Sequence, residues 1–207
     1  MRKIQMSPLL REILLTLVLA LVLYGIFNLV LETRGIEQTS MQPTIEPGER
    51  FFVSKMSYRL HDPERGDVII LRSPHDRDPI PKIKRIIAVL SGEPYGPDPT
   101  PNIKRVIGLP GETIEIKDGA VYINGLVLQE PYLVEKTTGL VSALTIPEDS
   151  YFVMGDHRSV SLDSRSWGIL PRENIIGKTI WRYWPLGRFG TAPNSEPILI
   201  TTEGEGV

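Results

Sequence analysis

The longest apolar run in the chain lies close to its N-terminus. Residues 13–31 read ILLTLVLALVLYGIFNLVL, nineteen residues without a charged side chain. As a helix, this length spans about 29 Å, close to the hydrocarbon thickness of a bilayer. A cleaved secretory signal has a shorter apolar region of about 7–15 residues, and no small-x-small cleavage pattern follows the run. The pattern therefore predicts an uncleaved transmembrane anchor over residues 13–31.

Basic residues around this run predict its orientation. Arg2, Lys3 and Arg11 precede it, whereas only Arg34 follows it closely. Positive charge is enriched on the cytoplasmic side of membrane helices. We therefore expect residues 1–12 in the cytoplasm, a single pass through the cytoplasmic (inner) membrane, and the rest of the chain outside.

Beyond residue 32 the apolar positions form short runs separated by turn residues. The clearest runs, rich in Val, Ile, Phe and Tyr, are Arg50–Val53, Asp67–Leu71, Thr113–Ile116, Ala120–Ile123 and Tyr151–Met154. Asp118-Gly119 is typical of a tight hairpin turn that leads into an alternating strand. No long stretch after residue 35 has a helical period. We expect a mainly β domain of several short, twisted antiparallel strands over residues 32–190.

Two segments fall outside this strand pattern. Residues 74–101 carry seven of the eighteen prolines, which predicts a surface insert, since proline cannot join a central sheet. Residues 191–207 are polar apart from Ile198–Ile200, and no secondary structure is predicted for this tail.

Composition excludes several kinds of chemistry. The net charge of −2 and pI near 6.0 provide no basic field for nucleic acid. The absence of cysteine rules out thiol catalysis, disulfides and cysteine-bound zinc. No metal, nucleotide or haem motif is present, so no cofactor is expected. Histidine-dependent schemes are limited to His61, His75 and His157.

Ser40 is a candidate nucleophile close to the membrane. It lies nine residues after Leu31 (40 − 31), in the phrase TSMQPT. Nine extended residues reach at most about 30 Å, so Ser40 stays near the membrane surface, where a substrate emerging from the bilayer would meet it. The alternative is an ordinary solvated serine before a proline turn.

A lysine could activate this serine if burial removed its proton. The free lysine pKa of about 10.4 would have to fall by roughly three units, about 4 kcal/mol, for work near neutral pH. Lys104 has an apolar, strand-like setting in IKRVI, but Lys84 lies in the nearly identical phrase IKRII twenty residues earlier (104 − 84). The local pattern leaves both lysines open, and a solvated strand-edge lysine is the alternative for each.

A third group of polar residues follows the predicted strand Tyr151–Met154. Residues 155–168, GDHRSVSLDSRSWG, combine two aspartates, two arginines and four serines in a turn-rich stretch. Such a stretch suits either a salt-bridged surface loop or a polar shell that supports a site.

These groups, in this order behind an N-terminal anchor, resemble the type I signal peptidase family. SMQPT at 40–44 resembles the nucleophile motif, and GDVII at 66–70 the strand motif after it. IKRVIGLPGE at 103–112 is similar to the general-base motif, and YFVMGDHRSVSLDSRSWG at 151–168 to the last one. The resemblance extends from the anchor to about Pro185.

The resemblance implies a serine endopeptidase with a serine–lysine dyad. Lys104 would be the base, because it is followed by RVIGLPG, whereas Lys84 is not. Ser161 would orient Lys104, and the Ser40 backbone N–H would donate to the oxyanion. The implied substrates are exported preproteins, cleaved after small residues at the outer face of the membrane.

The resemblance also implies an ion pair of Asp163 with Arg165 that holds the loop, with Arg105 as a candidate third member. Two positions depart from the family pattern. His157 replaces the usual asparagine after Gly-Asp, and Gln38 replaces a small residue, often a hydroxyl donor to the oxyanion hole. The Gln38 amide would donate the same bond from a longer arm.

Other functions remain to be weighed against this one. A Ser-His-Asp hydrolase would use His157 with Asp156 or Asp163, but the Gly-x-Ser-x-Gly elbow is missing. A catalytically silent anchored β domain that binds exported proteins is a second alternative. The anchor argues against a soluble self-cleaving repressor. The oligomeric state, the preferred preproteins and the role of the insert are not predictable from the sequence.

Overall fold

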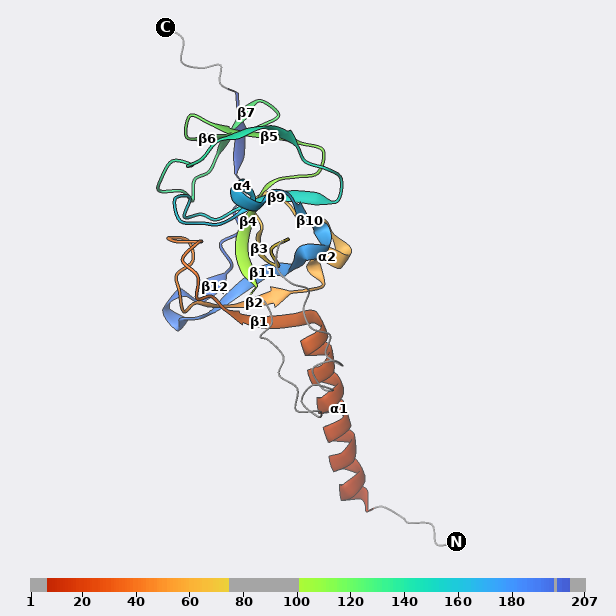
Figure 1. Cartoon of the computed structure of the whole chain (residues 1–207). Coiled ribbons are helices and arrows are strands. Elements are labelled where there is room, and N and C mark those ends of the chain that lie inside the picture. The colour runs from red at the N-terminus through yellow and green to blue at the C-terminus, as the bar shows by residue number, and fades with distance from the viewer. Residues whose placement is uncertain (1–6, 75–100, 196, 202–207) are drawn as a thin grey trace, which may run out of the picture.

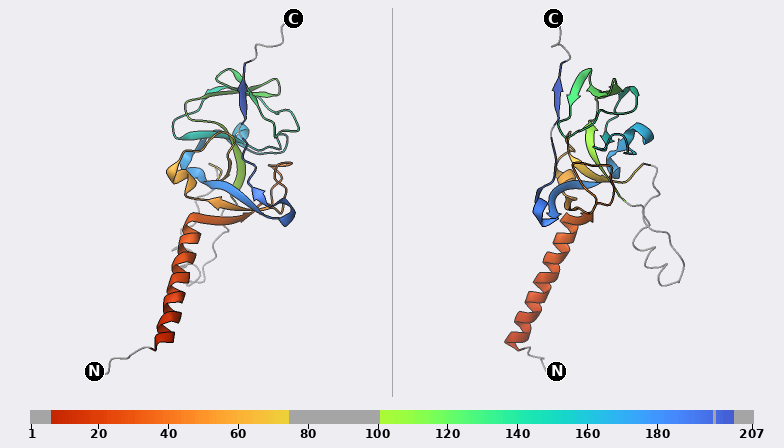
Figure 2. Two further views of the ribbon diagram at one scale, coloured as in Figure 1. Left: turned by 180° about the vertical axis from the view of Figure 1, so that it is seen from behind. Right: turned by 90° about the vertical axis from the view of Figure 1, so that its left-hand side faces the viewer.

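The computed structural model describes residues 7–74, 101–195 and 197–201. In this part of the chain the strands form two antiparallel sheets, of eight and five strands, with one long helix projecting from the domain (Figures 1 and 2). The prediction of a mainly β domain behind an apolar helix is confirmed. Of the predicted insert at residues 74–101, residues 75–100, including Lys84, lie outside the described residues.

The larger sheet has the order β1-β2-β11-β3-β4-β9-β10, with β12 paired to β11. Its strands are β1 (Leu31–Gly35), β2 (Arg50–Ser54), β3 (Val68–Leu71), β4 (Asn102–Gly108), β9 (Ser150–Met154), β10 (Leu170–Pro171), β11 (Ile175–Trp184) and β12 (Gly190–Thr191).

The smaller sheet has the order β13-β7-β6-β5-β8. Its strands are β5 (Thr113–Lys117), β6 (Ala120–Ile123), β7 (Leu126–Gln129), β8 (Val141–Thr145) and β13 (Ile198–Ile200). The short helices are α2 (Ser57–Leu60), α4 (Ser164–Trp167), η1 (Arg172–Asn174) and η2 (Leu186–Arg188).

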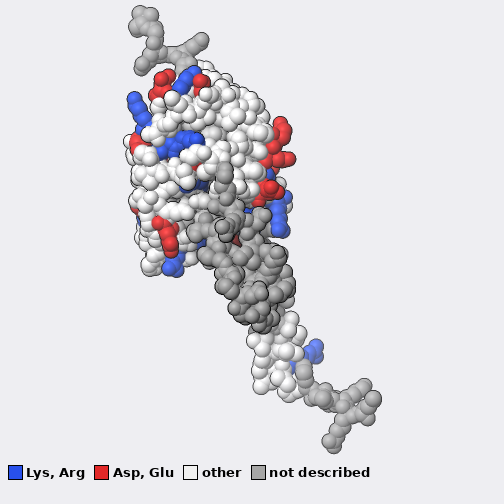
Figure 3. All heavy atoms as spheres, in the orientation of Figure 1, with Lys and Arg blue, Asp and Glu red and all other residues white. Residues whose placement is uncertain are grey.

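The apolar helix α1 runs from Pro8 to Val30 and spans 23 residues. It starts before the predicted position because Ser7 caps it, accepting the Leu10 N–H at 3.3 Å, and because proline is favoured in the first turn. The window Pro8–Gly25 is apolar enough to cross a membrane, and none of it is buried against the domain. In Figure 3 the visible part of this helix is almost free of charge, whereas charged groups are spread over the domain.

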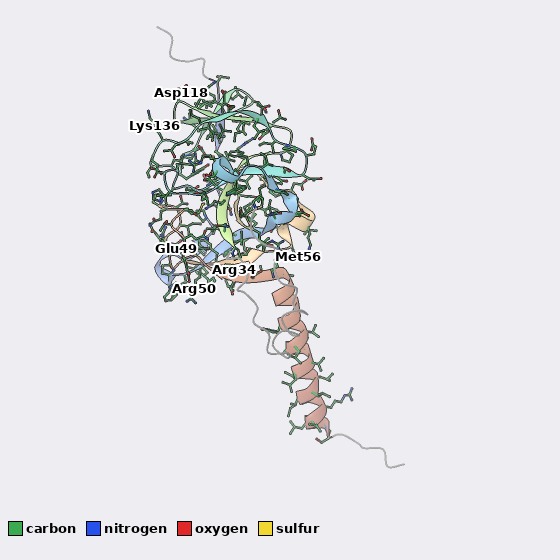
Figure 4. All side chains as sticks on the ribbon, viewed as in Figure 1. Arg34, Glu49, Arg50, Met56, Asp118 and Lys136 are labelled. Carbon is green, nitrogen blue, oxygen red and sulfur yellow. The ribbon has the colours of Figure 1, made fainter. Side chains whose placement is uncertain are left out.

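Hairpin turns build the smaller sheet. Asp118 and Gly119 have φ angles of 54° and 79°, and Asn124 and Gly125 have 52° and 84°. Two consecutive positive φ angles match the twist of a two-residue hairpin, and Asp-Gly and Asn-Gly adopt them readily. The predicted turn at Asp118-Gly119 is therefore confirmed. Asp118 and Lys136 lie at the end of the domain farthest from α1 (Figure 4).

All five predicted strands are present within one residue of their predicted limits. The longest strand, β11, escaped prediction because its pairing shifts between Thr179 and Trp181 and again between Arg182 and Trp184. Each irregularity interrupts the two-residue alternation by which a strand is detected in a sequence.

The tail requires a correction, because part of it is ordered in strands. Residues Ile198–Ile200 form β13, which pairs with β7 in the register Ile198↔Gln129, and Thr191 belongs to β12. A three-residue apolar run is too short to predict a strand, and its partner β7 is about seventy residues away along the chain.

Strand β4 lies at the centre of the domain (Figure 1). It pairs with β3 on one side and β9 on the other, and only its first residue is partly exposed. Ile103, Val106 and Ile107 each belong to a different buried apolar cluster. Side chains on β4 are therefore held rigidly and away from water.

Candidate active site

Ser40 lies on the connection between β1 and β2. The ends of this connection are tied together, since the Ile36 N–H donates to the Glu49 carbonyl at 2.8 Å. Met41 and Ile45 are fully buried in the core beneath it. Two buried apolar side chains thus fix the backbone directly after Ser40, which is itself only 8% exposed.

The Ser40 side chain faces β4. Its hydroxyl donates a long hydrogen bond of 3.5 Å to the carbonyl of Ile103, the residue before Lys104. The Ser40 carbonyl accepts the His157 N–H at 3.0 Å. In the described part of the chain the Ser40 N–H has no acceptor, so this donor is free for a ligand.

Lys104 lies on β4, opposite Ile69 of β3, and is 2% exposed. Burial lowers its pKa from 10.5 to about 8; Arg165 lowers it further, while Asp163 and Asp156 oppose the change. Among the described residues, Lys104 has no salt-bridge partner. A pKa of about 8 leaves an appreciable neutral fraction near neutral pH.

Ser40 and Lys104 open into the same surface hollow of about 320 Å³, which also includes Gln38 and Asn102. Val160 and Leu162, which are 57% and 69% exposed, form its apolar rim. A smaller hollow of about 170 Å³ shares Gln38 and continues past Ile103. A larger hollow elsewhere contains neither Ser40 nor Lys104. The arrangement is an open, partly apolar groove with a hydroxyl and an amine at its base.

Ser161 lies beside Ser40, with Gly155 between them. A Cβ atom at Gly155 would come within 2.3 Å of both the Ser161 hydroxyl oxygen and the Ser40 carbonyl oxygen. The Ser161 hydroxyl is buried and forms no bond of hydrogen-bond geometry with the described residues. Sequence reasoning missed the role of Gly155, which was visible only as a glycine directly after a strand.

Asp163 and Arg165 form a two-bond ion pair, with Nε–Oδ1 and Nη2–Oδ2 distances of 2.8 and 2.7 Å. Asp163 also accepts the Gly155 N–H at 3.0 Å. Burial would raise the pKa of Asp163, but the hydrogen bonds and charge of Arg165 outweigh it and lower the pKa. The carboxylate therefore stays ionised and holds Gly155 in place.

Arg105 was expected as a candidate third member of this ion pair, but it binds a different aspartate. Its guanidinium binds Asp156 through two bonds of 2.9 and 2.6 Å and donates to the carbonyls of Gly66 and Pro193 at 2.9 Å each. Arg105 is fully buried. The sequence could not indicate Asp156 as its partner, because several aspartates and arginines occur in the same loop.

The Gln38 amide is already engaged within the groove by one of its two N–H donors. Its amide nitrogen donates to the Asn102 side-chain oxygen at 3.3 Å, across the groove. Its amide oxygen is buried without a partner in the described ranges. Asn102 was not anticipated as a site residue, because nothing in the sequence marks it except its position two residues before Lys104.

The groups for a histidine triad are not brought together. The His157 ring contacts the Thr39 carbonyl at 3.3 Å. Asp156 is bound by Arg105 and Asp163 by Arg165, and no histidine–carboxylate pair occurs in the described residues. Over the same residues, no group of three or more His, Asp or Glu side chains is arranged to hold a metal ion.

Known proteins share most of this chain. The sequence model of the family described as "Signal peptidase, peptidase S26" matches residues 9–184. The chain is 37% identical to "Probable signal peptidase I-2" of Synechocystis sp., over 84% of this chain and 73% of the relative. It is 40% identical to "Signal peptidase I" of Leptolyngbya laminosa, over 89% and 84%.

A third relative is "Thylakoidal processing peptidase 1, chloroplastic" of Arabidopsis thaliana, 35% identical over 74% of this chain and 42% of the relative. The region that the family matches contains both Ser40 and Lys104. With a match over most of its length, the chain belongs to the signal peptidase family, peptidase S26.

Proposed function

We propose that Ser40 and neutral Lys104 form the catalytic dyad with which this serine endopeptidase removes signal peptides from exported preproteins. The observation that carries the proposal is the shared position of a buried hydroxyl and a buried amine in one groove. The pKa of about 8 at Lys104 supports its role as the base, because a general base works best when its pKa is near the working pH.

In the proposed reaction, Lys104 accepts the Ser40 proton as the hydroxyl oxygen attacks the scissile carbonyl. The Ser40 N–H donates to the oxyanion that forms. When the tetrahedral intermediate collapses, the ammonium of Lys104 returns the proton to the leaving amine and an acyl-enzyme remains. Lys104 then takes a proton from water as the water oxygen attacks the ester carbonyl. When the bond to the Ser40 oxygen breaks, the ammonium returns this proton to that oxygen, and the signal peptide leaves with a C-terminal carboxylic acid.

We assign orienting roles to three further residues. The buried Ser161 hydroxyl, which lies near Asp163 and helps to lower the pKa of that carboxyl, would accept a hydrogen bond from Lys104 in the enzyme–substrate complex. Asp163 and Arg165 would hold the loop that carries Ser161, since the loop is tied through Asp163 to Gly155. The Gln38 amide is held toward Asn102 by one N–H, and the Ser40 N–H has no acceptor among the described residues, so the Ser40 N–H is the favoured oxyanion donor.

We further propose that α1 anchors the protein in the cytoplasmic membrane, with the catalytic domain outside. The hairpin of β11 and β12 lies at the same end of the domain as the junction with α1 (Figures 1 and 2). It exposes large apolar side chains, including Trp181, Trp184, Leu186 and Phe189. Tryptophan is favoured at membrane–water interfaces, so this end of the domain suits contact with lipid headgroups.

Cleavage of a purified preprotein by the full-length enzyme tests the dyad. Ser40→Ala and Lys104→Ala should each abolish cleavage, whereas Lys84→Ala and His157→Ala should retain it. Activity that survives Lys104→Ala but is lost in Lys84→Ala would transfer the base to Lys84. Loss in His157→Ala with retention in Lys104→Ala would favour a histidine triad.

A further inference from the structure

The connection between β7 and β8 packs against β4 and the loop after β9, through contacts with Arg105 and Arg158. Glu130 on this connection binds both terminal nitrogens of Arg158, with an Nη1–Oε2 distance of 2.9 Å. Both side chains are buried, at 0% exposure for Arg158 and 5% for Glu130. A buried carboxylate with two bonds to one guanidinium fixes that group strongly.

Tyr132, two residues later, links this pair to a second arginine. Its hydroxyl donates to Glu130 at 2.6 Å, and its ring lies under the guanidinium of Arg105 at 3.9 Å. Burial, with Glu130 close by, raises the pKa of Tyr132, so its hydroxyl keeps the proton that it donates. Arg105 precedes Val106 on β4 and directly follows Lys104.

Both arginines hold the loop on which Ser40 rests. Arg158 donates to the Gly155 carbonyl at 2.9 Å, and Arg105 binds Asp156. The next residue, His157, donates its N–H to the Ser40 carbonyl. Glu130 and Tyr132 therefore contact the arginines that bind Gly155 and Asp156. Neither residue lines the groove that contains Ser40 and Lys104.

We propose that Glu130 and Tyr132 are positioning residues for the peptidase reaction: through Arg158 and Arg105 they set the placement of Ser40 and Lys104. The inference rests on the proposed dyad. Its physical basis is that a misplacement of about 1 Å in a reacting group costs about a hundredfold in rate. A loosened loop would also admit water to Lys104 and weaken the burial that keeps it neutral.

The test measures kcat, KM and the pH dependence of kcat/KM for full-length Glu130→Gln, which keeps the shape of the side chain. Glu115→Gln, at a partly exposed glutamate paired with Lys117 in the smaller sheet, is the matched control. We expect kcat for Glu130→Gln to fall about tenfold or more with KM nearly unchanged. The pH at which kcat/KM rises should move up by about half a unit or more.

Raising the pH should therefore recover part of the lost rate in Glu130→Gln, which a merely less stable protein would not show. Tyr132→Phe removes only the hydroxyl and should shift the profile in the same direction by less. A wild-type profile in Glu130→Gln overturns the inference. If Glu130→Gln does not fold, a wild-type profile in Tyr132→Phe overturns it. Full activity in Ser40→Ala or Lys104→Ala would instead reject the dyad itself.

Discussion

At the scale of single residues, the site is organised around a lysine whose charged form is disfavoured by its burial in the fold. Lys104 has a pKa of about 8 in the folded chain against 10.5 for a free lysine, a difference that corresponds to about 3 kcal/mol. Below pH 8 both the folded and the unfolded chain carry the proton, and the folded state bears this cost in full. Between pH 8 and 10.5 only the unfolded chain keeps the proton, so the cost is progressively relieved.

The first prediction concerns the rate. We expect kcat/KM to rise with pH, with a midpoint near the Lys104 pKa of about 8, and to level off above it, because only neutral Lys104 can accept the Ser40 proton. Initial rates on a preprotein between pH 6 and 10 measure this. A rate that is flat across pH 7–9 would contradict the role of Lys104 as the base.

The second prediction concerns stability. Lys104→Met should raise the free energy of unfolding at pH 6–7 by about 1–3 kcal/mol while abolishing activity, because an apolar side chain has no charge to desolvate. Urea denaturation measures this. Lys117→Met, at an exposed lysine of the smaller sheet, should leave stability within about 0.5 kcal/mol. A less stable Lys104→Met protein at pH 6–7 would show that burial of the amine is not costly.

The third prediction uses the close packing of Ser161 and Ser40 around Gly155. Gly155→Ala should lower kcat by about a hundredfold and stability by about 1–3 kcal/mol, because the new Cβ meets two oxygen atoms at 2.3 Å. Gly187→Ala, which meets no atom within 4 Å, is the control. The assays are preprotein cleavage and thermal unfolding. An active Gly155→Ala enzyme would mean that Ser161 and Ser40 can separate without loss of function.

At the scale of elements, the C-terminal segment completes the sheet that carries Lys104. The Asn194 side chain accepts the Val68 N–H at 2.7 Å and donates to the Thr179 carbonyl at 3.0 Å, bridging β3 and β11. The carbonyl of Pro193 accepts from Arg105. Together with β13, this segment connects the two sheets at Arg105, the residue after Lys104.

The fourth prediction follows from these bonds. Truncation after Thr191 should lower both stability and activity, since it leaves Val68 and Arg105 each without one partner and uncovers the edge of β7. Truncation after Thr201 keeps all of these contacts and should match the full chain. Thermal unfolding and preprotein cleavage compare the two truncated chains. Equal behaviour would show that residues 192–201 contribute nothing to the site.

These elements also show what the sequence can and cannot predict. The hairpin at Asp118-Gly119 and the strand character of the residues around Lys104 depend on local residues, and both were predictable. The burial of Lys104 was not, because Lys84 lies in a nearly identical phrase. The pairing of Arg105 with Asp156 and of β13 with β7 depends on segments far apart in the chain, which no local pattern encodes. The irregular strand β11 falls between these cases, because its bulges hide a real strand from a period-two search.

At the scale of the whole molecule, the apolar helix α1 and the candidate site belong to one connected structure. Helix α1 ends at Val30 and β1 begins at Leu31, without an intervening loop. The Val30 carbonyl accepts the Lys55 N–H at 3.0 Å, which ties the end of the helix to the residue after β2. Arg34 and Met56 mark this end of the domain in Figure 4.

The fifth prediction tests the orientation of the anchor. The chain has no cysteine, so single cysteines report position without background. A membrane-impermeant thiol reagent should label Ser142→Cys, an exposed position on β8, in cells whose outer envelope is permeable to the reagent and whose cytoplasmic membrane is intact. Ser7→Cys, at the start of α1, should react only after the membrane is permeabilised. The reverse pattern would place the catalytic domain in the cytoplasm.

The direct passage from α1 into β1 has a consequence for substrate choice. With α1 in the membrane and Ser40 as nucleophile, as proposed, a stiff junction would make the enzyme a ruler: the length of β1 and its pairing with β2 would set the distance from the bilayer to Ser40. A peptide bond is then selected by its height above the lipid as well as by the residues beside it. Glycines inserted between Val30 and Leu31 would slacken this ruler, and cleavage would spread to bonds on either side of the normal one.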